Sequence, residues 1–368
     1  MMTAMQYYRT LQGETEPVFT PFISTWNTAN TSVGSSTSTQ VKLPLVSAGT
    51  YNFVVTWGDA TSDVITTWNQ VETTHTYASS GTYTITITGL CLGFSFAGLN
   101  DRLKIIEISQ WGDSIYYSDT FNNQNNGHYR GCSNLTILSL DSPKWSTNRS
   151  CEGFFFQATN ITGSGISNIN LSGQISLIGF FNTTNFNESI NSWDVSSVVL
   201  FNSMFSSCPN FNQDLNSWDV SSATSLLNMF NTATNFNGNI SSWDVSNVVS
   251  FQNTFNSAGS FNSNIGMWNT VSATNFSQMF FNAFAFNINI GDWNVSTVTN
   301  FANFMFGKTA LNFSTSNLDA IYNGWSLRSV VTGISITFGT AKYTAGSSSG
   351  RAILTSAPNN WVITDGGI

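Results

Sequence analysis

The feature that most constrains this chain is a motif that recurs every 25 residues between residues 186 and 306. Five tryptophans and five Phe-Asn pairs keep this spacing: Trp193, Trp218, Trp243, Trp268 and Trp293, and Phe186, Phe211, Phe236, Phe261 and Phe286. A fixed period of this length is typical of leucine-rich-type repeat architectures. A single unit cannot bury its own aromatic rings, so the repeats predict units stacked about 4.8 Å apart through parallel strands.

Each unit is predicted to contain one strand and one helix. In the unit that begins at residue 239, Ile240–Val245 alternates apolar and polar residues, as a short strand does. Apolar residues then recur at steps of three and four, which indicates a helix of about three turns with Ser246 as its N-cap. These apolar residues are Val248, Phe251, Phe255 and Ala258. The predicted fold class is therefore a right-handed, leucine-rich-repeat-like α/β solenoid.

The remaining sequence divides the chain into four predicted parts. Residues 1–16 are patternless and are expected to form an arm, and residues 17–92 contain alternating strands that indicate an immunoglobulin-like β-sandwich able to fold by itself. Residues 93–313 are predicted to form about eight coils. Residues 314–368 should cap the open end with a last helix near Leu318–Trp325 and a last strand near Gly333–Phe338.

The first part resembles a known family. Trp57-Gly58-Asp59-Ala60, followed by His75-Thr76-Tyr77 and Gly81-Thr82-Tyr83, is similar to the polycystic-kidney-disease (PKD) repeat. That family consists of immunoglobulin-like domains found as spacers in surface proteins, so the resemblance implies a PKD-like domain with a spacer role.

The repeats resemble a second family. Trp193-Asp194-Val195-Ser196 with Met204-Phe205 is similar to the BspA-like leucine-rich repeats of surface proteins, first grouped from mycoplasma lipoproteins. One unit departs from this pattern, because Thr270 stands where the family has valine. The resemblance implies a solenoid carried on a surface.

Composition excludes several classes of function. Charged residues make up 8% of the chain, against roughly 25% in an ordinary globular protein. The net charge of −8 leaves no basic patch for phosphates, so nucleic acid is not expected as a partner. No apolar run is long enough for membrane insertion, and the first residues lack the features of a signal peptide. The four cysteines have no metal-ligand spacing and are predicted to be free thiols: Cys91, Cys132, Cys151 and Cys208.

The titratable residues do not suggest catalysis. The two histidines, His75 and His128, lie on different segments, and His75 is expected to hold a turn. No nucleophile with a base, pair of acids or phosphate-binding loop is readable. We therefore predict no enzymatic activity, no catalytic residue, no metal and no cofactor.

A row of polar residues beside the predicted strands is the candidate ligand-binding site. It comprises Ser192, Asp194, Ser217, Asp219, Ser242, Asp244, Asn269, Asp292 and Asn294. Three stacked carboxylates could bind a cation. They could instead accept backbone amides in Asx turns, which we favour because Asn269 and Asn294 keep the acceptor without the charge. The Asn after each Phe is expected to pair with the backbone of the next unit.

These observations predict a non-enzymatic surface interaction protein. The preferred setting is a phage or virus structural protein, such as a fibre, spike or capsid decoration, that serves attachment or coat assembly at the virion surface. Its expected partners are other coat or fibre proteins and a host surface glycan or protein. A cellular surface adhesin is the alternative. An enzyme acting on glycans ranks last, because no acids are placed as a pair.

Overall fold

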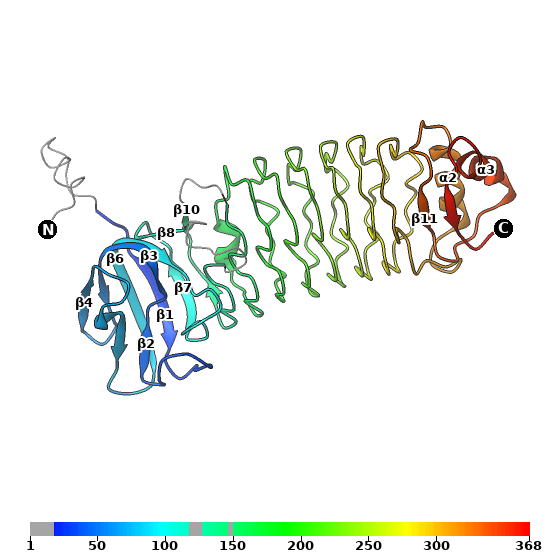
Figure 1. Ribbon diagram of the computed structural model, residues 1–368. Helices are drawn as coiled ribbons and strands as arrows, with labels where there is room; N and C mark the ends of the chain where they lie inside the picture. The colour runs from blue at the N-terminus through cyan, green and yellow to red at the C-terminus, as the bar shows by residue number, and fades with distance from the viewer. Residues whose placement is uncertain (1–17, 118–126, 146–149) are drawn as a thin grey trace, which may run out of the picture.

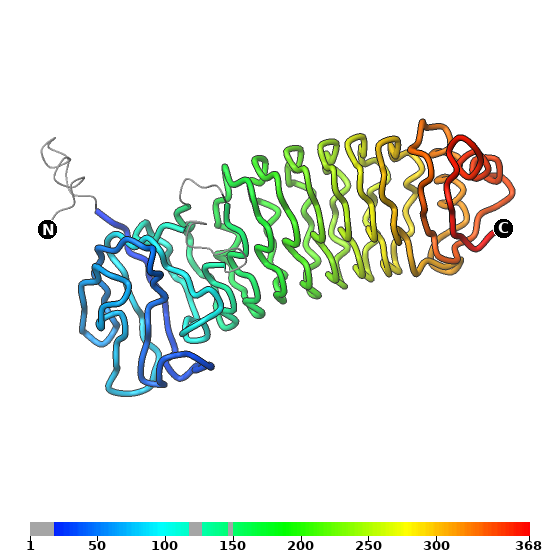
Figure 2. The backbone as a smooth tube through the Cα atoms, in the orientation of Figure 1, coloured from blue at the N-terminus to red at the C-terminus, as the bar shows by residue number. Residues whose placement is uncertain are grey.

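The computed structural model describes residues 18–117, 127–145 and 150–368. The chain forms an elongated body with a β-sheet region at one end, a row of stacked units in the middle and the helices α2 and α3 at the other end (Figure 1). The smooth backbone trace shows successive units side by side along the long axis (Figure 2). The predicted N-terminal arm, residues 1–16, lies outside the described residues.

The N-terminal region is built on antiparallel strands. β1 (Phe22–Asn27) and β3 (Leu45–Thr56) both pair with the long β6 (Thr82–Phe94), and β4 (Ser62–Ile65) pairs with β3. A separate pair consists of β2 (Gln40–Lys42) and β5 (Thr74–Thr76), which the 3₁₀ turn η1 (Val71–Thr73) precedes. Alternate residues of β1 point inward, so that Phe22 and Trp26 are fully buried.

Further strands extend the large sheet beyond the predicted sandwich. β7 (Ile105–Gln110) pairs antiparallel with β1, whereas β8 (Ile115–Tyr117) runs parallel to β6. β9 (Thr136–Ile137) and β10 (Lys144–Trp145) add parallel pairs to β7 and β8. An immunoglobulin-like sandwich is antiparallel, so the mixed sheet corrects that prediction. The sheet continues into the stacked units through β9, because Thr136 of β9 forms a parallel bridge with Thr162.

The core also runs across the predicted boundary at residue 92, which falls inside β6. One continuous cluster of buried residues extends from Phe22 in the sheet to Trp361 near the C-terminus. The segment of residues 17–92 therefore has no separate core of its own. The division of the chain into four parts remains a prediction.

A buried ion pair lies between the β1–β2 loop and the connection from β6 to β7. Lys104 Nζ lies 3.6 Å from Asp101 Oδ2, and both side chains are fully buried. Lys104 donates to the carbonyl oxygens of Ser36, Thr37 and Gln40, and Asp101 accepts from the amides of Ser36 and Lys42. These bonds hold the β1–β2 loop against the connection between β6 and β7.

In the middle of the chain, equivalent residues of successive units stack. Isolated parallel bridges join Ser150, Ser176, Leu200, Ser225, Ser250, Asn275 and Asn300 in order. The indole of Trp243 lies 6.4 Å from that of Trp218 and 6.2 Å from that of Trp268, and the rings of each pair are nearly parallel. Within one unit, Phe255 and Phe261 stack at 3.7 Å. The aromatic residues are therefore the interior of the stack.

The predicted helix of each unit is absent, so the α/β solenoid with a helix per coil is wrong. Asn253 and Ser257 have φ values of 55° and 58°, whereas an α-helix needs φ near −63°. The amide of Thr254 donates to Phe251 O in its own unit, and that of Phe255 donates to Met279 O in the next unit. Each unit is thus a chain of tight turns whose alternate amides bond to the neighbouring unit.

The physical reason for this error lies in the spacing. Phe251 and Phe255 are both fully buried and four residues apart. Successive tight turns with a period of four residues point the same side chains into the core as a helix does. The spacing of apolar residues alone therefore cannot distinguish a helix from a series of turns. Ser246 is not an N-cap, because no helix follows it, and its amide donates to Asp244 Oδ1 in an Asx turn.

The C-terminal end closes the stack with the structures expected there. α2 (Thr315–Trp325) begins at Ser314, whose side chain accepts from the amide of Asn317, and it buries Leu318 and Trp325. β11 (Ser335–Thr337) continues the last unit through a bridge to Phe301, and β12 (Val362–Thr364) pairs with β11 in parallel. η4 (Ala345–Ser347) and α3 (Ser348–Thr355) pack against α2.

Candidate ligand-binding groove

The repeated tryptophans are structural and leave the neighbouring polar residues to face solvent. Trp218 Nε1 donates to Ile190 O at 2.9 Å, and Trp243 Nε1 donates to Leu215 O at 2.9 Å. Each bond reaches back to the preceding unit, and the indoles of the regular units are at most 4% exposed. Tryptophan in this row therefore serves as a link between units.

The Asp and Asn residues of the predicted site form Asx turns, which confirms the interpretation favoured from the sequence. Each side-chain oxygen accepts the amide two residues later, at distances of 3.0 to 3.3 Å. The acceptors are Asp194, Asp219, Asp244, Asn269 and Asn294, and the donors are Ser196, Ser221, Ser246, Val271 and Ser296. The carboxylates thus already have protein donors.

These turns also affect the ionisation of the carboxyl groups. The hydroxyl and then the amide of Ser196 lower the pKa of Asp194, and those of Ser221 lower the pKa of Asp219. The negative charge of Asp194 acts in the opposite direction on Asp219. Within the described part of the chain, no group of three or more His, Cys, Asp or Glu side chains could hold a metal ion.

The asparagine that follows each repeated phenylalanine forms the expected ladder. Each side-chain Oδ1 accepts an amide of the next unit at 2.7 to 2.9 Å. The acceptors are Asn187, Asn212, Asn237, Asn262 and Asn287, and the last of them bonds to Ser314 at the start of the cap. This ladder therefore joins successive units.

All nine residues of the predicted site lie on the surface, and only Asn294 is half-buried. Two of the serines are held by the unit before them: Asn191 bonds to the amide and hydroxyl of Ser217, and Asn216 bonds to the amide of Ser242. Met267 interrupts the polar row and is 84% exposed. Only Ser192 and Ser217 line a hollow in the surface, whereas the other seven lie outside it.

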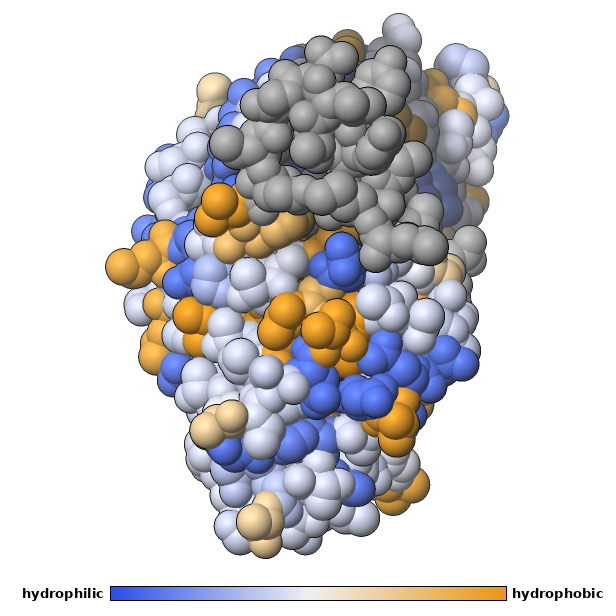
Figure 3. Space-filling model, turned by 90° about the vertical axis from the view of Figure 1, so that its left-hand side faces the viewer, coloured by the Kyte–Doolittle hydropathy of each residue, from blue (hydrophilic) through white to orange (hydrophobic). Residues whose placement is uncertain are grey.

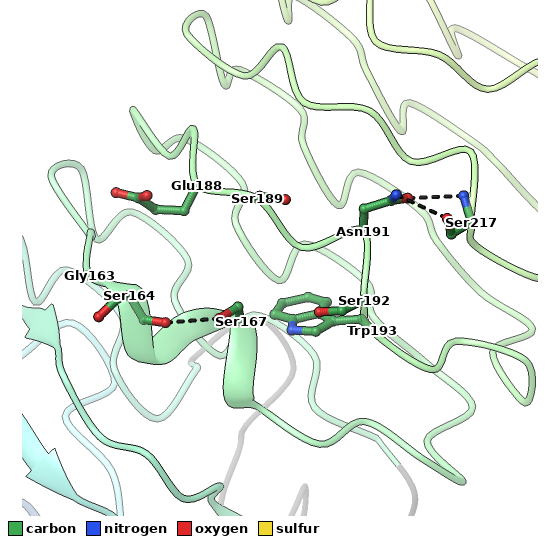
Figure 4. Close-up of a pocket in the computed structure, with 9 residues that line it drawn as sticks. All are labelled: Gly163, Ser164, Ser167, Glu188, Ser189, Asn191, Ser192, Trp193 and Ser217. Atoms are coloured by element: carbon green, nitrogen blue, oxygen red, sulfur yellow. Dashed lines mark hydrogen bonds between the residues drawn. The ribbon is translucent and has the colours of Figure 1, made fainter.

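That hollow, here called the first-unit groove, has a volume of about 770 Å³. Its lining residues are Gly163, Ser164, Ser167, Glu188, Ser189, Asn191, Ser192, Trp193 and Ser217. Figure 4 shows Ser164 and Ser167 on one wall, with the Trp193 indole beside Ser167, and Glu188 and Ser189 on the other wall. The groove is open to solvent and predominantly polar.

The groove forms where the regular stack begins. One wall is the 3₁₀ turn η3 (Ser164–Asn168), in which Ser167 Oγ donates to Ser164 O at 2.9 Å. Trp193 Nε1 donates to Ile166 O at 3.1 Å and so fixes this turn against the first regular unit. On the opposite wall, Glu188 accepts from the Thr162 hydroxyl at 2.7 Å. Both walls are therefore positioned by hydrogen bonds.

The groove offers hydrogen-bonding groups and no pair of groups suited to acid–base chemistry. It has five serine hydroxyls, one amide side chain and one carboxylate, that of Glu188. General acid–base catalysis needs a partner group within hydrogen-bond reach of the substrate's proton. A polar ligand with several hydroxyl groups matches this lining.

Seven lining residues were not among the predicted site: Gly163, Ser164, Ser167, Glu188, Ser189, Asn191 and Trp193. Glu188 could have been identified from the sequence, because it is the one charged residue at its position in the repeat. The other units have Gln213, Gly238, Ser263 and Ile288 there. The serines of η3 carry no such signal, since they precede the regular repeats. Only the fold brings them opposite Glu188.

The histidines and cysteines take structural positions. His75 Nε2 lies 2.8 Å from Asp59 Oδ2 and its ring stacks on Trp57 at 4.8 Å, so His75 holds the turn as expected. The four cysteines are buried, and burial raises the pKa of Cys208 to about 11. No helix in the described residues combines the length and apolar character needed to cross a bilayer.

Comparison with known proteins matches only the middle of the chain. A family model described as "Mycoplasma protein of unknown function, DUF285" matches residues 149–249 and 217–321. These two overlapping matches are consistent with BspA-like surface repeats, and neither reaches the residues that resemble a PKD domain. Comparison with curated proteins and with solved structures gave no match. Residues 149–321 are thus similar to a family whose function its description leaves open.

Proposed function

We propose that this protein is a non-enzymatic surface interaction protein that binds a polar, hydroxyl-rich ligand through the first-unit groove. The observation that carries the proposal is the lining of this groove, in which serine hydroxyls and one amide surround a single carboxylate. Binding sites fix polar ligands with a few well-placed hydrogen-bonding groups. The absence of a second titratable group in the lining favours binding over catalysis.

The first proposed setting is the surface of a phage or virus particle, with a role as a fibre, spike or capsid decoration. Its elongated body, with the sheet region and the cap at opposite ends, suits a protein that projects from or spans a coat (Figure 1). In that setting the partners are other coat proteins and a glycan or protein on the host surface.

The second candidate is a cellular surface adhesin. The match of residues 149–321 to a family described from Mycoplasma favours it, because that description refers to a cellular organism. Staining of purified particles and of intact cells with an antibody against this chain separates the two settings. Label on particles alone supports a virion protein, and label on cells alone supports an adhesin.

A glycan-array experiment with the full chain tests the binding role. Replacement of Glu188 by Gln and of Ser192 by Ala is expected to weaken binding about tenfold each, because the first change turns charge-assisted hydrogen bonds into neutral ones and the second removes a hydroxyl group. Ser242→Ala is the matched control, since Ser242 is an exposed serine of the same row outside the groove. Equal loss in all three variants, or no binding to any glycan or host cell, would refute the groove as the binding site.

A further inference from the structure

Trp68 stands apart from the other eleven tryptophans of the chain. It is 45% exposed, and it is the single tryptophan among the exposed large apolar residues of the described chain. Within that described part, its indole has no aromatic or hydrogen-bonding partner, whereas Trp218 and Trp243 donate to carbonyl groups of neighbouring units. Trp68 is therefore not one of the tryptophans that link neighbouring units.

The loop that presents Trp68 is fixed by one side chain. Gln70 Oε1 accepts from the amides of Thr66 and Thr67 at 2.8 and 3.1 Å, and Gln70 Nε2 donates to Val64 O at 2.8 Å. The Gln70 carbonyl also accepts from the Thr73 hydroxyl at 2.8 Å. The backbone of the loop that carries Trp68 is therefore held before any ligand arrives, which reduces the entropic cost of binding.

Trp68 borders a hollow of about 510 Å³ between its loop and the β2–β5 pair. The hollow combines apolar surface from Leu43, Leu45 and Val71 with amide and hydroxyl groups. The polar lining residues are Gln40, Asn69, Gln70, Thr73, Thr74, Thr76 and Asn100. Figure 3 views the molecule from this end, where small apolar groups lie among polar side chains.

Lys42 is the one ionisable residue in this lining. Its backbone amide donates to the buried Asp101, whereas its exposed ammonium group has no hydrogen bond or ion pair within the described residues. An anionic group placed in the hollow would thus meet a positive charge. A charge-assisted hydrogen bond of this kind is stronger than a neutral one. The neighbouring Glu72 carboxylate is not part of the lining and accepts from Gln70 Nε2 at 3.3 Å.

We infer that this hollow binds an acidic sugar residue of a glycan. The exposed indole offers a rigid apolar face with a polar N–H group, which suits the CH-rich face of a sugar ring. The amide and hydroxyl side chains match its hydroxyl groups, and Lys42 matches its carboxylate. This site is separate from the first-unit groove and does not depend on the function proposed for it.

The test uses the full chain labelled with 5-fluorotryptophan and observed by ¹⁹F NMR, with the Trp68 signal assigned by its loss in Trp68→Phe. The probes are trigalacturonic acid with its neutral methyl ester, and sialyllactose with neutral lactose. At least one acidic probe is expected to shift the Trp68 signal and to bind about tenfold more tightly than its neutral partner.

Two variants and a control make the result specific. Trp68→Ala should abolish binding, and Lys42→Met should lower affinity for the acidic probe about tenfold without changing affinity for the neutral one. Lys342→Met removes an exposed lysine in the cap and should have no effect. Equal melting temperatures would show that the variants are folded. The inference is overturned if no acidic probe moves the Trp68 signal at 10 mM, a concentration well above about 1 mM, or if Lys342→Met weakens binding as much as Lys42→Met.

Discussion

At the scale of single residues, Lys308 shows how the stack of small side chains ends. Earlier units have Cys208, Ala233, Ala258 and Ala283 at the equivalent position. Lys308 is 1% exposed, and its ammonium group donates to the carbonyl oxygens of Ala283, Phe284 and Phe286. In the unit before, the amide of Ala285 donates to Gly259 O. Phe284 O is the carbonyl equivalent to Gly259 O in the next unit. It accepts a hydrogen bond from Lys308 Nζ where the earlier unit uses a backbone amide.

Burial gives Lys308 a testable effect on stability. Desolvation lowers its pKa from the ordinary 10.5 to about 7, although the three carbonyl acceptors favour the charged form. Below pH 7 the lysine is charged in both states. Between pH 7 and 10.5, Lys308 stays protonated in the unfolded chain but loses its proton in the folded protein. The free energy of unfolding should therefore increase with pH, by at most about 1.4 kcal/mol per pH unit. Urea unfolding at pH 7 and pH 9 should show this rise in the wild type.

Lys308→Met supplies the comparison, because it retains the side chain's length without its charge. The variant should show a smaller rise in stability from pH 7 to pH 9 than the wild type. An identical pH dependence in both proteins would contradict the assignment to Lys308.

Phe230 tests the importance of one aromatic side chain. It is fully buried, stacks on Phe236 at 3.9 Å, and contacts Phe205 and Phe255 of the adjacent units. Phe230→Ala should lower the free energy of unfolding by about 3 to 5 kcal/mol, since the cavity affects three units at once. Phe306→Ala is the control because that ring is 50% exposed, and a similar loss there would show that burial is not the cause.

At the scale of elements, the tight turns replace the expected helices, and glycine substitution distinguishes the two. Ser203 has a φ of 56°, a conformation in which glycine has no steric penalty. Ser203→Gly should therefore leave stability unchanged or raise it by up to about 1 kcal/mol, and Ser203→Val should lower it by about 1 to 2 kcal/mol. Urea unfolding measures both differences.

A true helix in the same molecule provides the control for that experiment. Ala320 lies inside α2, where glycine should cost about 1 kcal/mol. A destabilising effect of Ser203→Gly equal to that of Ala320→Gly would contradict the turn structure of the repeated units.

At the scale of the whole molecule, the continuous core leads to the prediction that the N-terminal part does not fold alone, contrary to the expectation from its sequence. A fragment that ends at residue 92 lacks β7, the antiparallel partner of β1, and also lacks Asp101 and Lys104, which hold the β1–β2 loop. It should show no cooperative thermal transition by circular dichroism. The full chain, measured in parallel, should show one. Cooperative unfolding of the fragment would support an independent domain after all.

The sequence by itself determined the features that depend on local chemistry or on the 25-residue spacing. An Asx turn needs only an acceptor two residues before an amide, so Asp219 and Asn294 could be interpreted correctly from the chain. The ladder that begins at Asn187 needs only equivalent residues in register. The last helix, α2, was also predictable, because its apolar residues and its N-cap Ser314 lie close together in the sequence.

Only the tertiary structure decided between helix and turns in each unit. Both conformations turn Phe251 and Phe255 inward, and the choice depends on amides that bond to the next unit, as Phe255 does to Met279. The two hollows were equally beyond reach of the sequence. Ser164 and Glu188 line one hollow, and Trp68 and Lys42 line the other, through packing of segments about 25 residues apart. Spacing fixes which residues are buried, whereas long-range hydrogen bonds fix the backbone that buries them.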